Sequence, residues 1–347
     1  MALPGDAYTP SRINISIGDQ PGAVFGRVLH ARWDGWVASV HDEAPEASGG
    51  GNVVAAIGAA SLAISEAFLF LLDRPGSIAG YRDLSINLWA GGGEAPELSF
   101  APAGWWLVGL GHLGQAYAWT LSHLRYRSPE LVEVFLQDTE ATSFANHSTS
   151  VLTPRKTKVP KTRLVADYLD RSGFQSRIVE RRMSSETVPR DVERGHVALI
   201  GVDNLLSRRL ESQMGWHRVI DAGLGNKPAT FTSISLHSFP GGRESNAVEA
   251  WKDDEFHPDS LPNSPGFEDL SKHFDECGVI VLAGKAVGVP FVGMTAAAMG
   301  VASAISEVLG GGTVDVVNFE LTNGTLRRGA ATSASDISLP ALELSKN

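Results

Sequence analysis

The chain of 347 residues is long enough for two domains of ordinary size, or for one large α/β domain with additions. It is 43% hydrophobic and 20% charged, which is typical of a globular protein and argues against global disorder. The net charge of −10 argues against a nucleic acid or an anionic membrane as the main partner. The single cysteine, Cys277, excludes an intramolecular disulfide and a multi-cysteine zinc site.

No targeting or membrane segment is evident in the sequence. The N-terminus has no apolar core of the kind that a signal peptide needs. The two longest apolar runs, at 53–72 and 279–301, are interrupted by polar residues, glycine or proline, and this pattern predicts buried helices and not membrane spans. We therefore expect a cytoplasmic protein.

Residues 1–103 are predicted to form an additional N-terminal α+β region. A segment at 25–41 contains tryptophan, and after a polar loop the chain continues into an Ala-rich helix at 52–72 and a strand at 84–90. The loop at 91–103 is rich in Gly, Pro and Glu, which makes it the best candidate for a linker.

From residue 104 the pattern changes to strand, glycine turn, helix and strand. This order predicts an α/β Rossmann-like domain at 104–330, with a mostly parallel sheet and helices on both faces. The predicted strands lie at 105–110, 132–136, 175–179, 197–202, 219–222 and 230–238, and the predicted helices at 115–124, 163–172 and 205–216. Residues 240–275 are expected to form a long polar surface loop that leads to Cys277. Residues 331–347 are assigned to a C-terminal tail, and residues 333–347, which have no strong pattern, are expected to be mobile.

A weak internal echo links residues 55–72 with residues 295–311. Both are runs of small residues that contain Ile-Ser-Glu and are followed by a predicted strand. Two interpretations stay open. The runs are either unrelated Ala-rich core helices or two copies of one unit, of which the N-terminal copy is a degenerate half-repeat without a nucleotide loop.

A glycine motif marks the predicted nucleotide site. Gly109, Gly111 and Gly114 form a G-x-G-x-x-G between a strand and a helix, which suits a tight turn, close approach to phosphate and close helix packing. Asp138 ends the next strand, where a carboxylate can bind both ribose hydroxyls. These residues alone predict an adenine nucleotide, and an NAD-dependent oxidoreductase fits them as well. We assign no catalytic role to His112 within the motif.

Polar residues further along the chain favour ATP over a dinucleotide. A site that attacks the α-phosphate of ATP needs a cation on the phosphates, a polar anchor and a carboxylate for Mg²⁺. Lys161, Asn146 and Asp203 supply these three groups, and hydride transfer has no evident use for them.

The order of motifs resembles a known family. The chain contains, in sequence, GLGHLG, LQDTEATSFAN, KVPKTRLVADYL, GVDNLLSRR and ECGVIVLAGKAVGVPFVGMTAAAMGVASAI. Over about two thirds of its length it resembles the adenylating enzymes of the ubiquitin-activating family, the ThiF/MoeB type. The resemblance implies a ThiF-type adenylation domain at 104–330.

The resemblance also implies roles for single residues. It assigns Gly109, Gly111 and Gly114 to the nucleotide loop. It assigns Asp138 to the ribose, Asn146 and Lys161 to the phosphates, and Asp203 to magnesium. It assigns Cys277 to the position where some members form a thioester or persulfide, and Asn204 and Arg208 to support of the turn after Asp203.

Three departures from the family pattern stand out. The arginine expected three residues after Asn146 is Thr149, and basic residues of the same loop are candidates to compensate: Arg155, Lys156 and Lys158. The cysteine pairs that hold structural zinc in many relatives are absent from the sequence. Residues 1–103 do not match the short helix that donates an arginine across the dimer in the simplest relatives. Arg12 is a candidate for that arginine.

The leading hypothesis is therefore ATP-dependent adenylation of the C-terminal carboxylate of a small ubiquitin-like or sulfur-carrier protein, or of a peptide, followed or not by thioester formation on Cys277. ATP and Mg²⁺ are the expected cofactors, a conjugating enzyme is a candidate further partner, and a homodimer is expected. The echo at 52–90 is an alternative source of a second half within one chain. Two alternative functions stay open: a degenerate module that binds nucleotide or a ubiquitin-like protein without turnover, and an NAD-dependent oxidoreductase.

Overall fold

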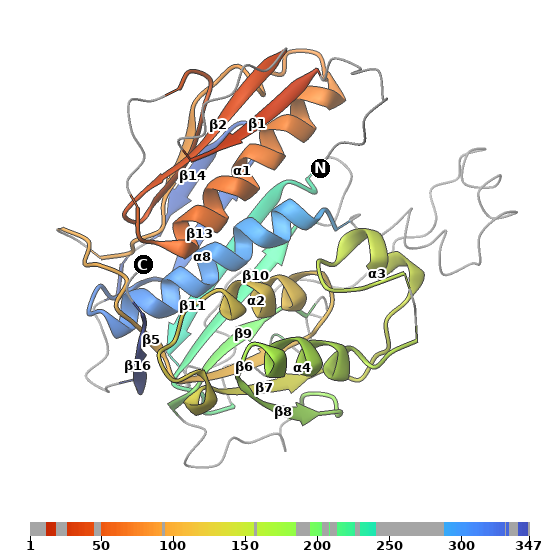
Figure 1. Ribbon diagram of the computed structural model, residues 1–347, viewed down its shortest axis with the longest axis vertical. Coiled ribbons are helices and arrows are strands. Elements are labelled where there is room, and N and C mark those ends of the chain that lie inside the picture. Colours follow the sequence, from red (N-terminus) through yellow and green to blue (C-terminus); the bar gives the residue numbers. More distant parts are fainter. Residues whose placement is uncertain are drawn as a thin grey trace, which may run out of the picture.

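The structure is a computed structural model of the chain (Figure 1). It describes residues 12–18, 26–44, 50–91, 94–155, 158–184, 195–202, 208, 214–225, 230–240, 288–329, 331–332 and 339–345. Both Asp203 and Cys277 lie outside these residues.

One large sheet organises the C-terminal part of the chain. Its eight strands follow the order β14-β13-β11-β10-β9-β6-β7-β8, and the five strands from β10 to β8 are parallel, whereas β11, β13 and β14 add antiparallel neighbours. The fold is therefore α/β with a Rossmann-like parallel core, as predicted. The strands are β6 (Gly104–Val108), β7 (Glu133–Gln137), β8 (Gln175–Val179), β9 (Val197–Ile200), β10 (Arg218–Leu224), β11 (Ser233–Pro240), β13 (Val316–Glu320) and β14 (Thr325–Arg328).

Burial explains the central strands. Every residue of β6 and β9 is buried, and both are short apolar runs without alternation, which is typical of parallel strands covered on both faces. A cluster that includes Trp106 and Trp216 fills one face, where the Trp106 ring stacks on Phe135 with 4.4 Å between the ring centroids. The helix predicted at 205–216 falls largely outside the described residues. Residue 208 is helical, but residues 214–216 are not.

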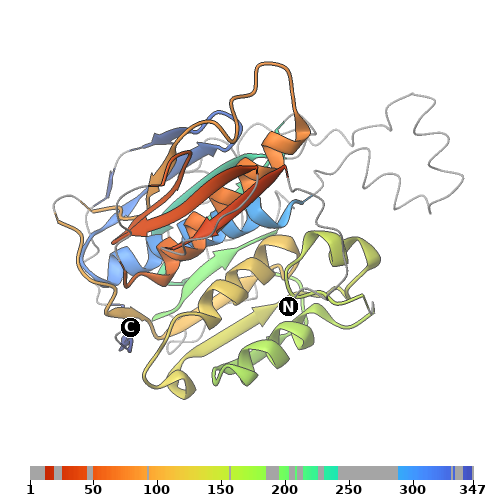
Figure 2. The same ribbon diagram turned by 45° about the horizontal axis from the view of Figure 1, so that its top comes forward.

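Three helices cover the other face of this sheet (Figures 1 and 2). They are α2 (His112–Ser122) over β6 and β9, α4 (Lys161–Arg171) over β7 and β8, and α8 (Pro290–Val308) over β10 and β11. A short helix, α3 (Phe144–Thr149), lies in the segment between β7 and α4. The sequence did not predict α3, because six residues are too few to show a helical period.

The N-terminal part forms a second, smaller sheet in the order β1-β2-β3-β4, packed on the helix α1. Its elements are β1 (Ile13–Ile17), β2 (Arg27–Asp34), β3 (Val37–His41), α1 (Val53–Leu72) and β4 (Leu84–Asn87). Within the segment predicted at 25–41, residues 27–41 form a hairpin that turns at Gly35, whose φ of +49° favours glycine. Asn52 caps α1 by accepting hydrogen bonds from the amides of Val54 (3.0 Å) and Ala55 (3.2 Å).

The two helices that carry the internal echo lie side by side, as both views show (Figures 1 and 2). At their contact the Thr295 hydroxyl of α8 donates to the Ser61 hydroxyl of α1 at 2.9 Å, in a buried position. Both helices are long and apolar enough to cross a membrane, but 61% of the most apolar window of α1 and 89% of that of α8 are buried within the protein. The packing therefore accounts for their apolar composition.

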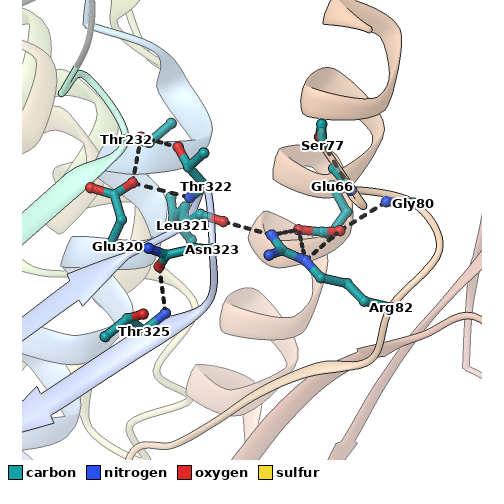
Figure 3. Close-up of polar contacts among 11 residues, drawn as sticks. Glu66, Ser77, Gly80, Arg82, Thr232, Glu320, Leu321, Thr322, Asn323 and Thr325 are labelled. Atoms are coloured by element: carbon teal, nitrogen blue, oxygen red, sulfur yellow. Dashed lines mark hydrogen bonds and ion pairs between the residues drawn. The ribbon is translucent and has the colours of Figure 1, made fainter. Parts of the chain in front are cut away.

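A buried carboxylate anchors α1 and connects the N-terminal part to the large sheet (Figure 3). Glu66 is fully buried, accepts from the Gly80 amide at 2.9 Å and forms an ion pair with Arg82 at 2.5 Å. Arg82 also donates to the carbonyl of Leu321 at 2.8 Å, which lies just after β13. Because a buried charge needs a partner, this ion pair fixes the end of β13 against the N-terminal part.

The tail differs from its prediction. Residues 341–343 form β16 (Ala341–Glu343), which pairs with β5 (Phe100–Pro102), and Leu339 and Leu344 on either side are buried. The expectation of mobility is therefore wrong for residues 339–345. A strand of three residues is too short to leave an alternating pattern in the sequence.

A second buried carboxylate stabilises the C-terminal end of α8. Glu307 accepts from Arg218 Nε at 2.7 Å and Nη2 at 2.8 Å, and it contacts His217 Nε2 at 3.1 Å. Burial alone raises the pKa of Glu307, but the hydrogen bonds from His217 and Arg218 and the charge of Arg218 outweigh it and lower the pKa to about 2.

This shift predicts how acid affects stability. Because the folded pKa lies below the ordinary value of 4.5, the carboxylate stabilises the fold above pH 4.5, and that contribution is lost as the pH falls toward about 2. Glu307→Gln is expected to cost about 3 kcal/mol at pH 7, and the difference from the natural protein is expected to shrink below about pH 4. Urea unfolding at several pH values measures this, with the exposed Glu343→Gln as the control. A pH-independent difference would contradict the assignment.

Candidate functional site

The glycine loop between β6 and α2 has the form that the motif predicts, and each glycine has its own physical reason. Gly109 has φ +80°, which only glycine adopts without strain. A Cβ atom on Gly114 would overlap the carbonyl oxygen of Gly109, so α2 packs against the turn at a distance that excludes any side chain. A Cβ atom on Gly111 would meet no atom of the described residues within 4 Å. Among these residues, the position of that Cβ atom at the N-terminus of α2 is therefore open.

The carboxyl ends of three parallel strands meet at this loop. The Gly109 amide donates to Gln137 O of β7 at 2.8 Å, and the Gly201 amide, just after β9, donates to Val108 O of β6 at 2.8 Å. A Cβ atom on Gly109 would lie 3.0 Å from both the Gly201 backbone and the Val202 side chain. In doubly wound sheets, ligands bind in the crevice at these strand ends.

Asp138 lies directly beside the glycine loop. Its Oδ2 atom accepts from the Leu110 amide at 2.6 Å, and its Oδ1 atom accepts from the Glu140 amide at 2.7 Å. Two backbone amides thus hold the half-buried carboxylate at the mouth of the loop. Each oxygen still has a second lone pair that can accept a hydrogen bond from a ligand.

The segment after Asp138 folds back and brings Lys161 to the same place. The Thr142 amide donates to Val159 O at 2.8 Å, the Lys158 amide to Thr142 O at 2.8 Å, and the Lys161 amide to Glu140 O at 3.0 Å. The Lys161 ammonium then pairs with the Glu140 carboxylate at 2.6 Å. The Lys161 side chain is 8% exposed and the Glu140 side chain is 72% exposed. The cation is therefore buried, whereas its partner faces solvent.

Asn146 and Thr149 lie on α3, in the same folded-back segment. The Asn146 Oδ1 atom accepts from the Ser143 amide at 2.8 Å and from the Ser143 hydroxyl at 3.1 Å, which caps the start of α3. Thr149, in the position of the expected arginine, donates to Ala145 O at 3.0 Å within the helix. Arg155 and Lys158 in the same segment are exposed.

Two polar residues of this region were missed by the sequence analysis. Gln115 of α2 is fully buried, donates to Leu110 O at 3.1 Å and accepts from the Leu152 amide at 3.0 Å, so it ties the glycine loop to the segment after α3. Glu140 is the partner of Lys161. A polar residue on the buried side of α2 was a usable signal for Gln115, whereas nothing in the spacing indicates the pairing of residues 140 and 161.

Arg208 supports the backbone just before Asp203. It donates to Val202 O from Nε at 3.2 Å and from Nη2 at 3.0 Å, and its guanidinium lies 3.5 Å from the Asp221 carboxylate of β10. Complete burial raises the pKa of Asp221 to about 6, an effect that the Arg208 charge opposes. Asp203 itself lies outside the described residues, directly after Val202 in sequence. Within the described part of the chain no group of three His, Cys, Asp or Glu residues is arranged to hold a metal.

The predicted site residues that the structure describes thus divide into two groups. Gly109, Gly111, Gly114, Asp138 and Lys161 gather at the carboxyl edge of the sheet, joined through Leu110 and Glu140. Asn146 lies nearby in sequence, and its amide oxygen is engaged in the cap of α3. Asp203 and Cys277 are not placed.

A parallel sheet with a glycine loop at its carboxyl edge defines a Rossmann-like protein, and comparison with known proteins gives the particular family. A family model for the BilD C-terminal domain matches residues 101–311, and one for the BilD N-terminal domain matches residues 3–88. The bacterial E1-like protein BilD of Collimonas sp. (strain OK412) is 36% identical over 295 residues, which is 80% of this chain and 62% of that protein.

The chain therefore belongs to the BilD family of bacterial E1-like proteins, and the resemblance to the ubiquitin-activating family is confirmed. It spans 62% of the length of the curated relative. Among solved structures, E. coli MccB with MccA aligns with a TM-score of 0.44 at 12% identity, over 67% of this chain and 65% of that one. E. coli tRNA N6-threonylcarbamoyladenosine dehydratase, TcdA, aligns with a TM-score of 0.36 at 12% identity, over 59% of this chain and 84% of that one.

The packing of the glycine loop predicts very unequal losses of stability for two similar substitutions. Gly114→Ala is expected to destabilise the fold by about 3 kcal/mol or more, because the methyl group overlaps the Gly109 carbonyl. Gly111→Ala is expected to cost about 1 kcal/mol or less, since the methyl group enters open space and alanine is only a poorer helix N-cap than glycine. Chemical denaturation without nucleotide measures both values. Equal losses of stability would contradict this account of the loop.

Proposed function

We propose that this protein adenylates a carboxylate with ATP. The observation that supports it is that Asp138 binds the Leu110 amide of the glycine loop, and that Glu140, whose amide binds Asp138, pairs with Lys161. A triphosphate fits this arrangement: the backbone of the loop and the N-terminus of α2 face its phosphates, the Asp138 carboxylate accepts from the ribose, and the Lys161 ammonium is the adjacent cation.

The chemistry follows from the leaving group. Hydroxide is a poor leaving group, so a carboxylate reacts poorly until AMP is transferred to it. The carboxylate oxygen forms a bond to the α-phosphorus, the bond to the bridging oxygen of pyrophosphate breaks, and an acyl-adenylate and pyrophosphate result. Negative charge grows on the α-phosphate oxygens during this step, and the helix N-terminus and Lys161 stabilise it from fixed positions.

Glu140 has a part in this proposal. Its exposed carboxylate is the partner of the buried Lys161 ammonium. A buried cation without a partner is costly, so Glu140 holds Lys161 in place until phosphate oxygens replace the carboxylate. Asp203 is the proposed ligand of Mg²⁺, and the ion would supply further positive charge at the phosphates.

The first test removes the two charged groups. Lys161→Ala and Asp203→Ala are each expected to reduce ATP–pyrophosphate exchange by at least about a hundredfold, the usual effect of losing one preorganised electrostatic contact in a transition state. Arg171→Ala, at the far end of the helix that Lys161 begins, is the control, because its exposed ion pair with Asp167 contributes little to stability. Full exchange activity in either variant at preserved fold would refute the assigned role.

For the substrate, we propose the C-terminus of a small ubiquitin-like or sulfur-carrier protein, or of a peptide, with a conjugating enzyme as a candidate further partner. Membership of an E1-like family supports this choice. Several acidic residues lie between positions 253 and 276 in the sequence, and they favour a basic surface on the partner, although a solvated acidic loop explains them more simply. Exchange assays with candidate carriers distinguish the active enzyme from a degenerate binding module, the alternative that Thr149 favours.

We further propose that Cys277 accepts the activated acyl group as a thioester. A thiolate is a strong nucleophile, and transfer from the adenylate releases AMP. Cys277→Ser is expected to retain ATP–pyrophosphate exchange and to lose an adduct that dithiothreitol cleaves. Gel analysis with and without the reductant measures this. If the natural protein forms no such adduct with a carrier that it adenylates, the thioester step is wrong.

Two expectations complete the proposal. The protein binds ATP and Mg²⁺ in preference to NAD, and calorimetry with each ligand separates it from an oxidoreductase. A homodimer remains our expectation, with the alternative that α1 and its sheet act as the second half within one chain. The cover of α8 by α1 supports the alternative, since this face of α8 is already buried.

A further inference from the structure

His112 is the first residue of α2, and its ring fits between two glycines at the start of α8. A Cβ atom on Gly288 would lie 2.5 Å from His112 Nδ1, and one on Gly293 would overlap Nε2. Neither glycine has a positive φ, so the backbone does not require glycine there. The imidazole occupies the space that side chains at both positions would fill.

The ring is buried, and only part of its hydrogen-bonding capacity is used among the described residues. Its Nε2 atom is buried without a hydrogen-bond partner among the described residues. Burial lowers the pKa of His112 to about 4, and hydrogen bonds with the backbone of Val289 and Pro290 only partly oppose this shift. At neutral pH the side chain is therefore uncharged, so it contributes shape and not charge at the phosphate end of α2.

The same two helices meet again further along, where a Cβ atom on Gly300 would lie 3.1 Å from the Tyr117 ring. Two rings of α2 thus pack on two glycines of α8. Only the first of these contacts adjoins the nucleotide loop, since His112 directly follows Gly111.

We propose that His112 is a positioning residue that sets the first turn of α2, and with it the glycine loop, against the N-terminus of α8. The consequence for nucleotide rests on the proposed function, because what His112 holds in place is the phosphate end of that site. The contact itself does not depend on nucleotide and can be tested without it.

The test is a double-mutant cycle between the ring and the glycine that it covers. Gly293→Ala pushes a methyl group into the ring, whereas His112→Ala removes the ring and leaves room for that methyl group. In the nucleotide-free protein, amide hydrogen exchange of residues 109–115 is expected to be about tenfold faster in Gly293→Ala than in the natural protein. In the double variant the exchange is expected to be slower than in Gly293→Ala and equal to that in His112→Ala. The dissociation constant of ATP with Mg²⁺ is expected to rise about a hundredfold in Gly293→Ala and about tenfold in both His112→Ala and the double variant, within the range of coupling between residues in contact.

Gly300→Ala is the matched control, because it is the same substitution on the same helix against the other ring of α2. It is expected to leave exchange at residues 109–115 near the natural level. If Gly293→Ala fails to fold, His112→Ala alone still tests the proposal, since unchanged exchange in the loop overturns it. Additive effects in the cycle also overturn it. If the exchange pattern holds but the natural protein binds no ATP, the positioning role stands and the proposed function fails; if ATP binds and every variant matches the natural protein, the reverse is true.

Discussion

The approach of the Gly109 carbonyl to Gly114 is the constraint on which the rest of the site depends. Because no side chain fits between them, α2 begins directly on the turn that ends β6, and its first amides point across the carboxyl edge of the sheet. Asp138, at the end of the neighbouring strand, then lies within hydrogen-bond distance of the Leu110 amide. If α2 began further from β6, the Asp138 carboxylate and the N-terminus of α2 would not lie side by side at this edge of the sheet.

A buried amide and a partly buried guanidinium hold this edge in place. Gln115 joins the glycine loop to the segment after α3, and Arg208 holds the carbonyl of Val202. A polar group that is removed from water and loses its partner costs free energy, so each of these bonds favours one arrangement of the loops. Lys161 differs from them because its partner, Glu140, is exposed. These contacts thus combine polar groups held inside the fold with an ion pair that reaches the surface.

The N-terminal and C-terminal parts of the chain are joined by buried charge and by helix packing. Arg82 of the N-terminal part neutralises Glu66 and at the same time binds the carbonyl of Leu321 in the C-terminal part. The helices α1 and α8 cover each other's apolar sides. Neither helix could expose this surface to water without cost, so the N-terminal part belongs to the hydrophobic core.

The sequence by itself determined the elements whose signals are local. A short apolar run before G-x-G-x-x-G indicated β6, the turn and α2, because steric limits at Gly109 and Gly114 act within six residues. The Ala-rich composition of α1 and the helical period of α4 are also visible within one segment. Only the tertiary structure decided which distant residues meet: Lys161 with Glu140, His112 with Gly293, and the strand at 341–343 with residues 100–102. Such contacts depend on the path of the whole chain and on which side chains that path buries. The spacing of residues along the sequence does not indicate them.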